Sequence, residues 1–148
     1  MRYVIQFIFA AFATLGFCLY FKVPKKTILI TCLISGIIWA IYEYTLKSSG
    51  SYLRSGFIAS FCIGIAAEIC AYFFKSPATV FSLPCLIPIV PGAGMYYIMY
   101  YFIYNDYSKM FTNLIHTLLI AAALSMGIVF SQAISKITKN ILKNHKLI

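Results

Sequence analysis

Charged residues are scarce in this sequence. Of its 148 residues, 10% are Asp, Glu, Lys or Arg, and only three of these are acidic. A soluble domain carries about 25% charged residues, and disordered segments and nucleic-acid modules depend on charged surfaces. The net charge of +9 does not make a soluble domain, a disordered segment or a nucleic-acid module more plausible, because 62% of the residues are apolar, against about 45–50% in soluble domains. This composition predicts an integral membrane protein.

Sequence motifs for catalysis and metal binding are also missing. We find no nucleophile elbow, no phosphate-binding glycine loop and no C-x-x-C pair. The five cysteines all lie inside apolar stretches. This position is typical of small buried apolar residues, and it does not indicate disulfide partners or metal ligands. We therefore predict no enzyme, no cofactor and no metal site. The cysteines are Cys18, Cys32, Cys62, Cys70 and Cys85.

Long uncharged stretches are what the sequence has instead. Five of them, of 19, 20, 20, 27 and 24 residues, lack Lys, Arg and Asp; they cover residues 3–21, 27–46, 55–74, 78–104 and 112–135. A helix needs about 20 residues to cross the hydrocarbon core, and strands of a barrel would alternate in polarity over about 10 residues. The prediction is one all-α transmembrane domain over residues 1–148, with about five spans. The first stretch imitates a signal peptide, but its apolar residues continue past the cleavage-like Ala11-Phe12-Ala13, which favours a retained span.

Cationic residues divide unevenly between the two sides of such a bundle. With five crossings, eight lie on one side and four on the other. The positive-inside rule then places the N-terminus outside and the basic tail, residues 136–148, in the cytoplasm. If the fourth stretch re-enters without crossing, the split is seven against five. The tail lysines are spaced three or four apart, as on one helix face against anionic headgroups, with a partner-docking helix as the alternative and nucleic acid disfavoured. They are Lys136, Lys139, Lys143 and Lys146.

The fourth stretch contains a break. Pro84, Pro88 and Pro91 fall within eight residues and are followed by Gly92-Ala93-Gly94, a run that cannot continue a regular helix. Each proline lacks an N–H, so the carbonyls four residues earlier, at Val80, Pro84 and Ile87, lose their usual donors. An unsatisfied carbonyl is costly in hydrocarbon, so the break has to face protein, water or a ligand.

Its position predicts a binding site. The break near Pro91 is at the middle of the stretch, close to the bilayer midplane, where secondary transporters often place broken helices and substrate. Freed carbonyls suit a cation, and a half-helix beginning about Gly92 offers N–H groups to an anion, so one break can hold a zwitterion. A kink that only shapes packing is the alternative. The predicted substrate-binding residues are Pro84, Ile87, Pro88, Pro91, Gly92, Ala93, Gly94, Tyr96 and Tyr97.

Three ionisable residues are candidates for proton coupling. Glu68 lies fourteenth in its stretch, on an i+4 row with Gly56, Ser60 and Gly64, and small residues there allow close helix contact. Glu68 should therefore face the bundle, where desolvation favours a protonated carboxyl. The alternative is a neutral acid hydrogen-bonded to a neighbouring helix.

Glu43 and His116 have weaker cases. Glu43 follows a row of Thr, Ser and Trp residues but lies three residues from the end of its stretch, which favours an interfacial role. His116 shares a face with Thr112, Asn113 and Thr117, a patch that either lines a path or ties helices together.

The tyrosines from 96 to 107 form an aromatic belt, of which Tyr96 and Tyr97 are deep enough to contact a bound amine.

Several segments together resemble a known family. They are Phe21-Lys22-Val23-Pro24, Ser35-Gly36-Ile37-Ile38-Trp39, Ala67-Glu68-Ile69, Lys75-Ser76-Pro77, Asn105-Asp106-Tyr107 and, most specifically, residues 84–96 with Ile87-Pro88-Ile89-Val90-Pro91-Gly92. Over nearly its whole length the chain resembles the small, YjjB-like subunit of the bacterial threonine/serine exporter family, which corresponds to the C-terminal half of the full-length exporter. Lys22 and Ile89 depart from the residues common in the family, and neither belongs to the predicted site.

The resemblance implies ion-driven export of small hydroxy amino acids across the bacterial cell membrane, with a larger subunit supplying the other half of the transporter. Some relatives are linked to a dicarboxylate such as succinate, so a carboxylate substrate stays open. Five spans are also about half of a typical secondary transporter, so a partner or a homo-oligomer is needed on independent grounds. A scaffold for the larger subunit is the second hypothesis, and an intramembrane enzyme using Glu43 and Glu68 is the least favoured.

Overall fold

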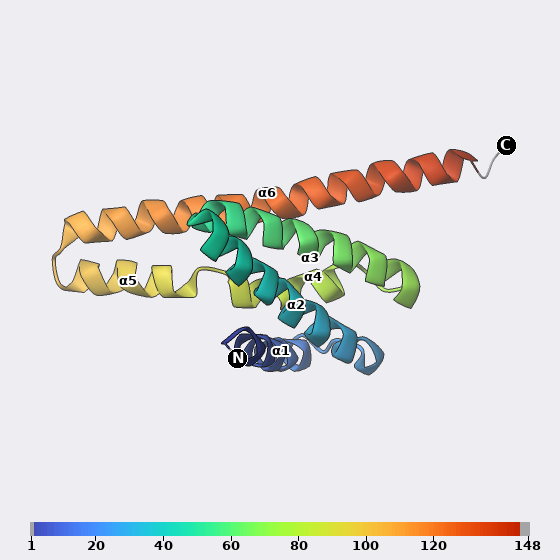
Figure 1. Ribbon diagram of the computed structural model, residues 1–148, viewed down its shortest axis with the longest axis horizontal. Helices are drawn as coiled ribbons and strands as arrows, with labels where there is room; N and C mark the ends of the chain where they lie inside the picture. Colours follow the sequence, from blue (N-terminus) through green and yellow to red (C-terminus); the bar gives the residue numbers. More distant parts are fainter. Residues whose placement is uncertain (1, 146–148) are drawn as a thin grey trace.

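The computed structural model describes residues 2–145, with side-chain surroundings for residues 4–139, and helices joined by short connections make up this part of the chain (Figure 1). The elements are α1 (Arg2–Tyr20), α2 (Lys25–Ser49), α3 (Tyr52–Phe74), α4 (Thr79–Leu86), the 3₁₀ helix η1 (Ile87–Ile89), α5 (Gly92–Ile103) and α6 (Tyr107–His145). The described residues contain no strand. The predicted all-α fold is confirmed.

Length and composition mark which helices can cross a membrane. Among the described residues α2, α3 and α6 are each long and apolar enough, and α4–η1 with α5 forms a fourth span if the pair, bent by 45°, counts as one. The apolar part of α1, Val4–Tyr20, is shorter than these. The molecule is therefore a multi-pass helical membrane protein whose fourth segment is broken, as the prolines and glycines predicted.

Local sequence sets where the helices end. Gly50 adopts a left-handed conformation with φ +62° and donates its N–H to the Leu46 carbonyl at 2.9 Å, which closes α2. Before α6, Asp106 accepts the Lys109 N–H on its side chain at 3.2 Å. This is an N-cap, and it lets the chain turn from α5 into α6 within a few residues.

Helices α3 and α6 lie side by side and run in the same direction (Figure 1). Small residues make this contact close: a β-carbon on Gly64 would collide with Ser131, and one on Gly127 would collide with Ser60. The row Gly56–Ser60–Gly64 therefore faces a neighbouring helix, as expected from its spacing.

A second packing unit joins α1, α2 and α4. The buried Thr14 hydroxyl of α1 donates to Ser35 of α2 at 2.6 Å, and the buried Cys85 thiol of α4 donates to the Thr31 carbonyl at 3.4 Å. All five cysteines are free thiols. Hydroxyl and thiol groups thus find partners inside the bundle, which keeps them away from lipid.

Helix α6 has 39 residues, so it is roughly 58 Å long, far more than a membrane crossing needs. Its second half packs along α3, while α5 packs antiparallel along its first half and has no buried residue (Figure 1). The helix continues beyond the last span, as the lysine spacing predicted, although Lys146 and the Lys143 side chain lie outside the described part. The break before α5 falls where these two halves of the molecule meet.

Candidate functional site

A cavity of about 580 Å³ lies at the break in the fourth segment. This volume is within the range of about 300–1,000 Å³ that is usual for small-molecule sites. Four helices contribute to it besides the break itself. Its lining consists of Trp39, Tyr42, Tyr52, Pro88, Ile89, Val90, Pro91, Gly92, Ala93, Gly94, Tyr97, Asn113, His116, Thr117 and Ile120.

The backbone of the break passes from the end of an α-helix through a 3₁₀ turn to a tight turn at Pro91. Helix α4 continues through Pro84 to Leu86, a 3₁₀ turn follows over Ile87–Ile89, and Pro91 has φ −74° and ψ 63°. The Gly92 N–H donates to the Val90 carbonyl at 2.7 Å, so Pro91 is the centre of an inverse γ-turn. The helix ends after Pro84 and resumes at Gly92, the residue predicted to begin the second half-helix.

Two carbonyls in the break have no backbone donor in the described part of the chain. The Ile87 carbonyl, expected to be free, accepts the Val90 N–H at 3.2 Å within the 3₁₀ turn. The unpaired carbonyls are instead those of Pro88 and Ile89. Pro91 has no N–H to give Pro88, and the N–H of Gly92 is already used in the γ-turn. Both residues line the cavity, so it contains acceptors for a cationic group.

The start of α5 supplies donors on the same cavity. The first N–H groups of a helix have no partner within it, and α5 has no side-chain cap. Gly92 directs its N–H into the γ-turn, which leaves those of Ala93 and Gly94 without an acceptor among the described residues. These two groups, together with the helix dipole, favour an anion at this end of the cavity.

The two glycines of α5 have different surroundings. A β-carbon on Gly92 would meet nothing within 4 Å, whereas one on Gly94 would collide with the Thr117 hydroxyl of α6. Gly92 therefore leaves space in the cavity. Gly94 instead allows α5 and α6 to approach closely, a packing role that its position in the sequence did not reveal.

Aromatic side chains form one wall. Trp39 and Tyr42 of α2 lie with their ring centroids 5.6 Å apart, Tyr52 begins α3, and Tyr97 comes from α5. Rings of this kind pack against the apolar part of a ligand and attract a cation to their faces.

Helix α6 contributes polar residues to the same lining. The Asn113 amide donates to the Lys109 carbonyl at 2.8 Å, and the buried Thr117 hydroxyl donates to the Asn113 carbonyl at 2.7 Å. His116 also lines the cavity. No Lys, Arg, Asp or Glu is among the lining residues, so the backbone break carries most of the polarity that a charged ligand would meet.

Most predicted binding residues come together here, and three do not. Pro88, Pro91, Gly92, Ala93, Gly94 and Tyr97 line the cavity. Pro84 is buried beside a separate cavity of about 190 Å³ near the end of α1, Ile87 is outside the lining, and Tyr96 is 64% exposed. Because α4 stays helical past Pro84, that proline lies a full turn away from the break.

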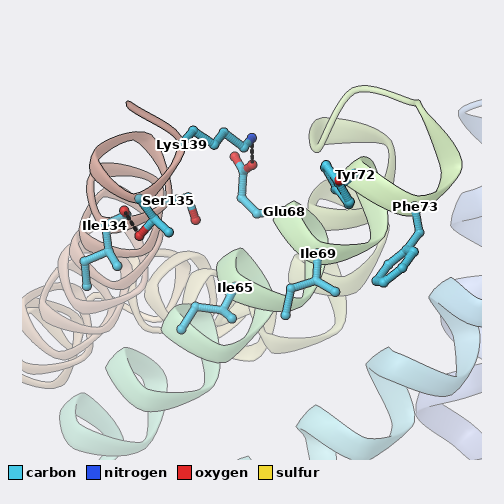
Figure 2. Close-up of a pocket in the computed structure, with 9 residues that line it drawn as sticks. Ile65, Glu68, Ile69, Tyr72, Phe73, Ile134, Ser135 and Lys139 are labelled. Atoms are coloured by element: carbon cyan, nitrogen blue, oxygen red, sulfur yellow. Dashed lines mark hydrogen bonds and ion pairs between the residues drawn. The ribbon is translucent and has the colours of Figure 1, made fainter. Parts of the chain in front are cut away.

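The candidates for proton coupling are dispersed. Only His116 lines the cavity. Glu43 is half-buried near Tyr42, and Glu68 lies in a different groove, where its carboxylate accepts from Lys139 Nζ at 2.5 Å (Figure 2). The sequence predicted that Glu68 faces the bundle, with a hydrogen bond to a neighbouring helix as the alternative; the ion pair with Lys139 of α6 is a contact that neither prediction named. No group of three His, Cys, Asp or Glu that could hold a metal occurs in the described part of the chain.

The sequence analysis did not name Tyr42, Tyr52 and Ile120, and it left Ile89 and Val90 out of the predicted site although both lie in the break and line the cavity. Trp39, Asn113 and Thr117 had been noted only as members of polar rows on their own helices. Their common cavity depends on how α2, α3 and α6 pack against the break. The one signal in the sequence for this part of the lining was Trp39, a large aromatic residue on a row of small polar residues.

These features define the class: a multi-pass helical membrane protein with a broken span at a partly polar cavity, as in membrane transporters. A model of the family described as Threonine/Serine exporter, ThrE, matches residues 6–134, and the chain belongs to this family. The match includes the break and all the residues that line the cavity. No solved structure matches the chain.

Proposed function

We propose that this chain is one half of a secondary-active exporter of small hydroxy amino acids, and that the cavity at the break is its substrate site. Membership of the threonine/serine exporter family supports the transport class. The observation that carries the site is the pairing of free carbonyls and free N–H groups on one cavity. A kink that only shaped packing would not need free carbonyls and free N–H groups on the same cavity.

The proposed binding mode follows from these groups. The ammonium group of the amino acid donates to the carbonyls of Pro88 and Ile89, and the carboxylate accepts from the N–H groups of Ala93 and Gly94. Thr117, whose hydroxyl is already oriented by Asn113, contacts the substrate hydroxyl. A dicarboxylate such as succinate fits less well, because no Lys or Arg lines the cavity and its second carboxylate would face the free carbonyls.

For proton coupling we propose His116. Of the three candidates it is the one on the cavity lining, so its charge changes the field that a bound zwitterion experiences. Glu68 and Glu43 lie outside the lining, and Glu68 is ion-paired with Lys139 in a different groove.

The other half of the transporter is proposed to be the larger subunit, with a homo-oligomer as the alternative. Polar groups on the cavity need a cover that lipid cannot supply, and α5 has no buried residue in the isolated chain. The eight-to-four division of cationic residues supports a cell-membrane protein with its N-terminus outside and its C-terminus in the cytoplasm.

Counterflow in proteoliposomes tests this function. Vesicles containing both subunits should exchange labelled threonine, unlabelled serine should compete, and succinate should not. Vesicles with either subunit alone should be inactive. If the larger subunit alone exchanges threonine with full affinity, this chain is a scaffold; if succinate competes better than serine, the substrate class is wrong.

A further inference from the structure

A second groove, of about 420 Å³, lies between the C-terminal parts of α3 and α6 (Figure 2). It shares no lining residue with the cavity at the break. Its polar centre is the ion pair between Glu68 of α3 and Lys139 of α6. The proposed export function does not use this groove.

The two charged groups are held differently. The Glu68 side chain is 18% exposed and sits on α3, whereas the Lys139 side chain is 60% exposed and extends across from α6 (Figure 2). The carboxylate is thus the more buried charge of the groove, and the ammonium belongs to the more exposed side chain. An incoming ligand can separate them only if it offers each one an opposite charge.

The rest of the groove is apolar. Ile65 and Ile69 of α3 and Ile134 of α6 line it below the ion pair, and Ile69 and Ile134 are each about half exposed. Close packing of Gly64 on Ser131 fixes the spacing of the two helices just before this point. The groove therefore has an apolar surface that is partly exposed on the described part of the chain.

The level of the ion pair along the helices is also informative. Helix α3 ends at Phe74, less than two turns after Glu68, and Lys139 lies one turn beyond Ser135, the last residue of the uncharged stretch. The ion pair thus lies near the end of the uncharged stretch of α6, while α3 continues without a charge from Ile69 to Phe74. Ile65 and Ile134 precede the charged residues on their helices, and this order, apolar groups first and charges beyond them, is that of a phospholipid, whose headgroup lies outside its acyl chains.

We propose that this groove binds a phospholipid with an ethanolamine headgroup. Its ammonium donates to Glu68, its phosphate accepts from Lys139, and an acyl chain lies along Ile65, Ile69 and Ile134. A choline headgroup has no N–H to donate to Glu68. An anionic glycerol headgroup offers hydroxyl donors to the carboxylate but no positive charge to replace Lys139, and a free amino acid leaves the apolar part of the groove empty.

Native mass spectrometry of the purified full-length protein, titrated with lipids of identical acyl chains, tests the proposal. Phosphatidylethanolamine should bind about tenfold more tightly than phosphatidylcholine or phosphatidylglycerol, since one charged hydrogen bond separates them. Glu68→Gln and Lys139→Gln should each remove this preference. Lys136→Gln removes the same charge from the same helix outside the groove, and it should keep the preference.

A further variant separates loss of binding from loss of packing. Ile69→Trp leaves both charges in place and fills the apolar part of the groove from a half-exposed position, so it should weaken binding of all three lipids without unfolding α3. Equal affinity for the three lipids in the wild type overturns the proposal. So does a preference for phosphatidylglycerol, which indicates a simple basic anchor, or displacement of the lipid by free threonine, which indicates a substrate site.

Discussion

Gly92 provides the most direct test of the cavity as a substrate site. A β-carbon there would meet no atom within 4 Å, so Gly92→Val adds its side chain to open space in the cavity. The φ of Gly92 is not in the left-handed region, so valine imposes no backbone strain. We expect the variant to fold and assemble like the wild type.

The expected loss of affinity follows from what the added side chain obstructs. Along the chain, Gly92 lies between the residues with free carbonyls, Pro88 and Ile89, and those with free N–H groups, Ala93 and Gly94. A branched side chain at this point prevents a ligand from touching at least one of the two sets. One hydrogen bond to a charged group is worth about 1.5–3 kcal/mol, which corresponds to a loss of roughly 10- to 150-fold in apparent affinity.

Gly16→Val is the matched control. A β-carbon on Gly16 of α1 also meets nothing within 4 Å, and Gly16 is not among the cavity residues. Both variants should be reconstituted with the larger subunit and compared by threonine counterflow at several substrate concentrations, after their abundance and assembly have been matched. Gly94→Val is unsuitable here, since it would collide with Thr117 and disturb the packing of α5 on α6.

Equal apparent affinities in the Gly92 and Gly16 variants would refute the reasoning. The break would then be a kink that shapes packing, and the free carbonyl and N–H groups would be satisfied by water or by the partner. A drop in assembly rather than in affinity for Gly92→Val would assign this face to the subunit interface.

Three further predictions concern other parts of the molecule. In a background without native cysteines, an impermeant thiol reagent should label a cysteine at Gly50 but not one at His145 in intact cells; the reverse pattern would invert the proposed topology. His116→Gln should retain threonine binding but lose the dependence of export on the pH gradient, and unchanged dependence would exclude His116 from coupling. The hydrogen bond from Lys109 holds the pKa of Asp106 below its ordinary value. Its stabilising effect is therefore present above the ordinary carboxyl pKa of about 4 and is lost as the pH falls through the lowered value. Thermal unfolding between pH 2 and 6 should show this loss in the wild type and not in Asp106→Asn.

Much of the fold could be predicted because membrane helices obey strong local constraints. An uncharged stretch of about 20 residues has few alternatives to a helix in lipid, and Pro91 followed by Gly92 interrupts a helix in any surroundings. The half-helix starting at Gly92 and the close contact of the Gly64 row needed no knowledge of which helices are neighbours. The bond pattern inside the break was less accessible. Whether Ile87 or Pro88 keeps a free carbonyl depends on a 3₁₀ turn that local sequence permits but does not require.

By itself the sequence determined the membrane class, the helical segments and the position of the break, since each follows from the chemistry of neighbouring residues. Only the tertiary structure decided that Trp39, Tyr42 and Tyr52 complete the cavity, and that Glu68 pairs with Lys139, 71 positions further along the chain. The physical reason is that a helix pattern shows which face is small or polar, but not which helix will cover it. In lipid no hydrophobic force selects that neighbour, so the choice depends on shape and hydrogen bonding across the whole bundle.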